Sequence, residues 1–132
     1  MEVAIGHEQG TMPITVFHVK GEIDNNTYQE LEAKAQEAFA QGTRNLLLDL
    51  TEVTYISSAG LRAIHFIFKL LTCEAPGESG EAMSQGLRDG TFKSPHLKLL
   101  KPSRAVQEVL RTTGFDMFLE IHRDLREAVA SF

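Results

Sequence analysis

Near its N-terminus the chain alternates hydrophobic with small or polar residues, at the period of a β-strand. Val3 and Ile5 begin this alternation, and a stretch rich in β-branched residues covers positions 14–19. The segment between them, residues 10–13, contains a glycine and a proline, which are typical of turns. We therefore expect an N-terminal β-hairpin that ends near Gly21.

The spacing of apolar residues then changes to that of a helix. A polar run over residues 22–27 contains several side chains able to cap a helix, and apolar positions at helical spacing follow from Tyr28 to Phe39. Gly42 is expected to stop this helix. The next apolar run, residues 46–50, has only Asp49 inside it, which is typical of a strand buried on both faces of a parallel sheet.

A second amphipathic helix is predicted from Ser58 to Leu71, with small residues in its first turn. Residues 73–95 then lose all periodicity and collect four glycines and two prolines. This composition predicts a long exposed loop, which is either ordered or disordered.

The C-terminal part repeats the alternation of strand and helix. We expect a short strand at 97–100, a helix from Pro102 to Gly114, a short strand near 117–121 and a last helix from Leu125. The order β-β-α-β-α-β-α-β-α predicts an α/β fold. Its sheet is expected to be mixed but mainly parallel, with four to five strands and four helices packed on it.

Length and composition restrict the class of protein. The 132 residues fit one domain spanning residues 1–132, and 42% of them are hydrophobic. The formal net charge is −5, without the basic footprint of a nucleic-acid binder. Cys73 is the only cysteine, which excludes an intrachain disulfide and fits a reducing cytosol. No signal sequence is evident, and the apolar stretch 61–71 is far shorter than the ~20 residues of a membrane span, so we expect a cytoplasmic protein.

The motifs of common enzymes and cofactor sites are missing. The five histidines are dispersed without metal-ligand spacing, and no glycine cluster is followed by the Lys-Ser/Thr of a P-loop. Ile56 to Gly60 lacks the first glycine of the Gly-x-Ser-x-Gly nucleophile elbow, so a serine hydrolase is a minor alternative. We therefore expect neither a metal site nor a cofactor.

The most distinctive segment leads from the apolar strand into the second helix through Ser57, Ser58, Ala59 and Gly60. One interpretation is structural, with either serine capping the helix. The functional interpretation is a phosphoacceptor, because a phosphate of about −1.5 to −2 charges is favoured at the positive end of a helix dipole. In a complex the same phosphate would have to be desolvated, so it would act as a release switch.

A second polar corner, Glu22 to Thr27, follows the hairpin. Its simplest interpretation is a strand end followed by a helix cap from Asn25, Asn26 or Thr27. Glu22 and Asp24 would also lie beside the Ser58 turn if the two strands are neighbours.

Three segments together resemble the STAS domain family, and specifically its anti-sigma-factor antagonists. They are Gly21-Glu22-Ile23-Asp24 with Thr27, Leu46 to Leu61, and Leu97 to Phe115. The resemblance implies a partner-switching protein without enzymatic activity. Unmodified, it would bind an anti-sigma factor with serine kinase activity, and phosphorylation of Ser58 would release it. A serine phosphatase would reset the system.

By this resemblance the partner surface comprises Glu22, Asp24, Asn25, Thr27, Ser57, Ser58, Ala59, Gly60 and Arg62. Ser57 stands where many family members have an aspartate, which makes it a rival acceptor, and the segment 73–95 is longer than the family usually shows. A STAS accessory subunit of a membrane transporter, a regulator of a non-sigma target and a ligand sensor are the alternative functions.

Overall fold

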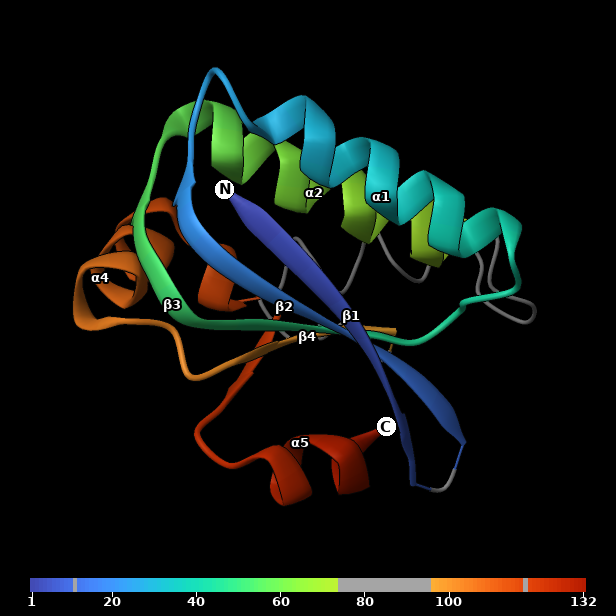
Figure 1. The fold of residues 1–132 in the computed structure, drawn as a ribbon. Coiled ribbons are helices and arrows are strands. Elements are labelled where there is room, and N and C mark those ends of the chain that lie inside the picture. Colours follow the sequence, from blue (N-terminus) through green and yellow to red (C-terminus); the bar gives the residue numbers. More distant parts are fainter. Residues whose placement is uncertain (11, 74–95, 118) are drawn as a thin grey trace.

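Five strands form one sheet in the computed structural model, which describes all residues except 11, 74–95 and 118 (Figure 1). The strands lie in sequence order and are β1 Glu2–Gln9, β2 Pro13–Ile23, β3 Leu46–Ile56, β4 Leu97–Leu100 and β5 Glu120–His122. β1 pairs with β2 antiparallel, and the other three pairs are parallel. The predicted mixed, mainly parallel sheet is thereby confirmed.

Helices pack on both faces of this sheet. They are α1 Tyr28–Ala40, α2 Ser58–Cys73, α4 Arg104–Thr113 and α5 Leu125–Ser131. α1, α2 and α4 share one core, whereas α5 lies on the opposite face of the sheet (Figure 1). The element order predicted from the sequence is confirmed. Of the predicted loop at 73–95, only Cys73 is described, as the last residue of α2, and the rest of the loop lies outside the described residues.

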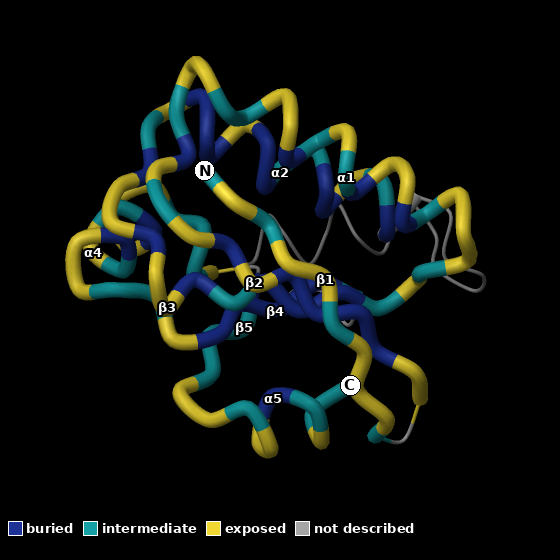
Figure 2. The backbone as a smooth tube through the Cα atoms, viewed as in Figure 1, coloured by how far each residue is buried: buried dark blue, intermediate teal, exposed yellow. Residues whose placement is uncertain are grey.

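The larger core lies between the sheet and the helices α1, α2 and α4. Alternate residues of β2 and β3, such as Phe17, Val19 and Leu48, point into it and are almost completely buried. α2 contributes Ile64 and Ile67, which have no exposed surface. In Figure 2 the buried segments accordingly follow the central strands and the inner sides of the helices, and the outer turns are exposed. This packing fixes the ends of β2 and β3 and the start of α2 relative to one another.

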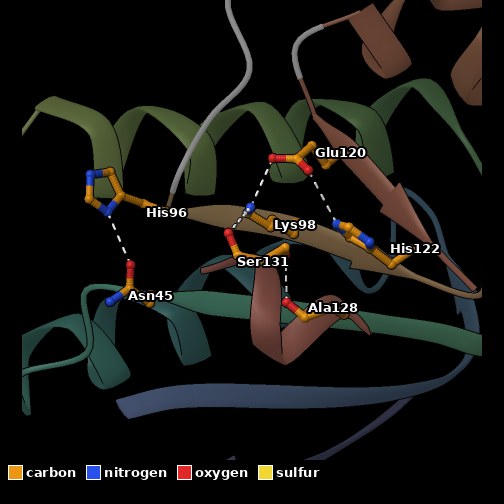
Figure 3. Close-up of polar contacts among 7 residues, drawn as sticks. All are labelled: Asn45, His96, Lys98, Glu120, His122, Ala128 and Ser131. Carbon is orange, nitrogen blue, oxygen red and sulfur yellow. Dashed lines mark hydrogen bonds and ion pairs between the residues drawn. The ribbon is translucent and has the colours of Figure 1, made fainter. Parts of the chain in front are cut away.

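The smaller core lies under α5. Ala128 of this helix packs on Val16, Leu47 and Leu100 of the sheet. Beside it the ammonium group of Lys98, a residue only 2% exposed, donates hydrogen bonds to the carboxylate of Glu120 and to the carbonyl oxygen of Ser131, both at 2.8 Å (Figure 3). Lys98 therefore ties the C-terminal helix to β4 and β5.

β2 and β3 both continue beyond the ends predicted from the sequence. β2 passes Gly21 and ends at Ile23, and β3 passes residue 50 and ends at Ile56. The pairing survives because register shifts near Gly21, which has a φ of +103°, allow the polar stretch of β3 to stay bonded to β2. The two strands consequently end side by side, with Ile23 opposite Ile56.

The last strand also begins later than predicted. Residues Phe115–Met117 form a 3₁₀ turn, and β5 starts only at Glu120. Gly114 adopts the left-handed conformation that ends α4, as expected for a glycine in that position.

Candidate functional site

Two strand-to-helix turns meet at the carboxyl ends of β2 and β3. The first turn, residues 24–27, joins β2 to α1, and the second passes from β3 through Ser57 into α2. The amide of Ser57 donates a hydrogen bond of 2.9 Å to the carbonyl oxygen of Ile23, which directly links the two turns. The structure thus brings together the two segments that the sequence analysis singled out.

The β2–α1 turn is held by bonds among its own residues. The Thr27 hydroxyl donates to the carbonyl oxygen of Glu22 and accepts from the amide of Asp24, both at 2.9 Å. The Asp24 carboxylate accepts from the amide of Asn26 at 2.9 Å. Thr27 occupies the N-cap position of α1 but makes no side-chain capping bond. The prediction of a side-chain cap there is wrong, because its hydroxyl is engaged within the turn.

The β3–α2 turn separates the roles of the two serines. The hydroxyl oxygen of the half-buried Ser57 accepts a hydrogen bond from the amide of Gly60 at 3.3 Å, which is the bond of an N-cap residue. Ser58 is the first residue of α2 and is exposed. Its hydroxyl makes no hydrogen bond with any of the described residues.

Gly60 lies where no other residue fits. A Cβ atom added to it would lie 2.5 Å from the carbonyl oxygen of Ile23 and 2.7 Å from the side chain of Ile56. The small residues predicted to admit another chain therefore admit the end of β2 instead. Ala59 and Gly60 are both buried, so they shape the turn rather than offer surface to a partner.

The outer surface of the two turns is polar. Four of the residues predicted to bind a partner are exposed, namely Glu22, Asn25, Ser58 and Arg62. Asp24, Thr27 and Ser57 are half-buried and take part in the hydrogen bonds described above.

Tyr55 is a surface residue that the sequence analysis did not select. It is 51% exposed and lies opposite Glu22 in the register of β2 and β3. The sequence shows an aromatic side chain in a polar stretch at this position. Its place on the surface could be predicted only once β3 was known to extend to Ile56.

A hydrogen-bonded carboxylate lies farther back along β3. The Asp49 carboxylate binds the His18 ring at 2.8 Å and also accepts from the amide and hydroxyl of Thr51. Partial burial works to raise the pKa of Asp49, but the bonds from Thr51 and His18 outweigh it and hold this pKa below its ordinary value. These residues line a cavity of about 350 Å³ together with Lys101.

Among the residues whose positions are described, no three His, Cys, Asp or Glu side chains gather closely enough to hold a metal ion. In the same part of the chain, none of the helices has the length and apolar character needed to cross a bilayer.

Comparisons with known proteins show what this chain resembles in sequence and in fold. BtrV of Bordetella bronchiseptica, which carries the provisional name of an anti-sigma factor antagonist, is 27% identical over 86% of this chain and 82% of its own length. The crystal structure of an anti-sigma factor antagonist from Mycobacterium paratuberculosis superposes with a TM-score of 0.69 at 20% identity, covering 98% of this chain and 93% of that one.

The antagonist SpoIIAA of Bacillus has the same fold. Its unphosphorylated form gives a TM-score of 0.67 at 20% identity, over 96% of this chain and 93% of SpoIIAA. Its phosphorylated form gives 0.58 at 20% identity, over 96% of both chains. A sequence profile of the STAS domain matches residues 7–75, more than half of the chain. This protein belongs to the STAS domain family.

Proposed function

We propose that this protein is an anti-sigma-factor antagonist in a cytoplasmic partner-switching system. Unmodified, it binds an anti-sigma factor that is also a serine kinase, and phosphorylation of Ser58 releases it. A serine phosphatase restores the binding form. One observation carries the proposal: Ser58 is the first residue of α2, and its exposed hydroxyl has no hydrogen-bond partner in the described part of the chain.

The contrast with Ser57 supports Ser58 as the acceptor. A hydroxyl that accepts a hydrogen bond in a half-buried turn is less accessible to a kinase than one that faces solvent. Ser57 is in the first situation and Ser58 in the second. A phosphate on Ser58 would also lie at the positive end of a 16-residue helix, where negative charge is favoured.

The release step follows from the charge that a phosphate adds. Free in water, a phosphorylated Ser58 remains solvated and the fold is unaffected. In a complex, the added charge of about −1.5 to −2 must be desolvated on a surface to which the adjoining β2–α1 turn already contributes the acidic residues Glu22 and Asp24. Each ~1.4 kcal/mol of this cost weakens binding about tenfold.

The similar proteins support the same function. The relatives named above are described as anti-sigma factor antagonists, and one of them, SpoIIAA, is known in unphosphorylated and phosphorylated forms. In this proposal the chain is a substrate and an inhibitor rather than an enzyme, and the kinase holds the ATP.

Affinity capture from the native cell tests the proposal. The tagged wild-type chain and its Ser58→Ala variant are expected to retain a kinase, whereas Ser58→Asp is expected to lose it. Incubation of the captured complex with ATP should place phosphate on Ser58 of the wild-type chain and leave Ser57 of Ser58→Ala without phosphate. Capture of membrane transporter subunits instead, or equal binding by all three forms, would contradict the proposal.

A further inference from the structure

The structure assigns to Ser57 the role of a positioning residue that presents Ser58 to the kinase. This inference rests on the proposed function and extends it to a neighbour that is not itself modified. It concerns the geometry of the turn rather than the chemistry of the acceptor.

Every hydrogen-bonding group of Ser57 is engaged. Its amide donates to the Ile23 carbonyl at 2.9 Å, its hydroxyl oxygen accepts from the amide of Gly60 at 3.3 Å, and its carbonyl accepts from the amide of Leu61 at 2.9 Å. The first of these bonds joins the turn to β2, and the other two join it to the first turn of α2. Ser57 therefore fixes the direction in which the chain leaves the sheet.

Ser58 is the next residue, so its orientation depends on this fixation. The backbone of the turn is further restrained by Gly60, which packs directly against the Ile23 carbonyl. With the hydroxyl of Ser57 as the cap, that of Ser58 is not needed for capping and stays in solvent. Without the Ser57 hydroxyl, Ser58 becomes the nearest side chain able to cap the helix, and capping would withdraw the phosphoacceptor from solvent.

The positioning role predicts a change in the kinetics with which the kinase phosphorylates Ser58. A kinase that binds only the presented form has an apparent affinity reduced by the fraction of chains in that form. Loss of a helix cap changes the equilibrium between the presented and the withdrawn Ser58 by a factor between about 2 and about 30. We expect Ser57→Ala to raise the KM of the kinase for this chain by a factor of up to about 30 while kcat stays nearly constant.

The chain itself contains a matched control. Ser103 caps α4 in the same way, and its hydroxyl oxygen accepts from the amide of Val106 at 3.4 Å. Ser103 is followed by Arg104 rather than by the proposed acceptor. Ser103→Ala should therefore lose a comparable amount of thermal stability without a change in KM.

The experiment measures phosphorylation of Ser58 by the kinase captured from the native cell, using full-length variants well below their melting temperatures. Ser57→Ala should raise KM, Ser57→Thr should restore it to within about twofold because threonine also caps helices, and Ser103→Ala should match the wild type. Equal KM values for Ser57→Ala and Ser103→Ala, or failure of Ser57→Thr to restore KM, would overturn the positioning role while leaving the proposed function intact. Absence of phosphate on Ser58 of the wild-type chain would overturn both.

Discussion

The surroundings of Lys98 and those of Ser58 show two different uses of polar groups in one small fold. The Lys98 ammonium group is inside the protein and bonded to Glu120 and to the backbone of Ser131 (Figure 3). The Ser58 hydroxyl is outside, next to Ser57, whose amide, hydroxyl and carbonyl groups all form hydrogen bonds. Buried polar groups have to be paired because an unpaired one retains its full desolvation cost. We therefore expect the polar groups around Lys98 to stabilise the fold, whereas the Ser58 hydroxyl is available to a partner.

The largest expected effect is at Lys98. Lys98→Ala leaves the Glu120 carboxylate without its cation and frees α5 from β4, so we expect unfolding to become easier by about 2–3 kcal/mol. This is below the usual cost of breaking a buried pair because water still reaches Glu120. Urea denaturation measures the change.

Arg111 is the control, since its bond to Glu108 is 2.7 Å long but both side chains are more than 60% exposed, and Arg111→Ala should cost less than about 1 kcal/mol. Equal losses for the two variants would show that burial does not set the strength of the Lys98 pair.

The next effect tests the turn as a packed structure. In an open helix a change of glycine to alanine stabilises by up to about 1 kcal/mol. At Gly60 the added methyl group would collide with the Ile23 carbonyl, so Gly60→Ala is expected to destabilise by about 1–3 kcal/mol. Gly6→Ala is the control, because the nearest atom to its new methyl group, in the His18 ring, would be 3.4 Å away. A stable Gly60→Ala variant would mean that the turn can move away from β2 at little cost.

A smaller expected effect concerns how the stability contributed by each of the two regions depends on pH. Partial burial works to raise the pKa of Glu120, but Lys98 and then His122 outweigh it and hold this pKa below its ordinary value of 4.5. A carboxyl with a lowered folded-state pKa stabilises the fold above its unfolded pKa, and this contribution is lost as the pH falls through the folded pKa. Urea midpoints at about pH 7 and about pH 3 should therefore differ less for Glu120→Gln than for the wild type. Ser57→Ala should leave the acid dependence unchanged, because residues 57–60 include no acidic or basic side chain.

The sequence predicts the Ser58 region better than the Lys98 region, and the reason is distance along the chain. Ser57 and Gly60 are only a few residues apart, so the small residues and the helix start could be recognised from local spacing. The contact of Gly60 with Ile23 could not, because it depends on the register shifts between β2 and β3. Lys98 looks like an ordinary polar position in a strand. Its burial depends on α5, whose bonded carbonyl group lies 33 residues farther along the chain.

The smallest stability effect is expected at Ser58 itself. Its hydroxyl is exposed and has no partner among the described residues, so Ser58→Ala should change the free energy of unfolding by no more than about 0.5 kcal/mol. Ser57→Ala, one residue away, should cost about 1 kcal/mol because it removes a cap. Thermal melts of both variants provide the measurement. If Ser58→Ala were the more damaging change, the Ser58 hydroxyl would be part of the structure, and the distinction between a committed Ser57 and an available Ser58 would be wrong. A neutral Ser58→Ala that also prevents phosphorylation would separate the function of this hydroxyl from the stability of the fold.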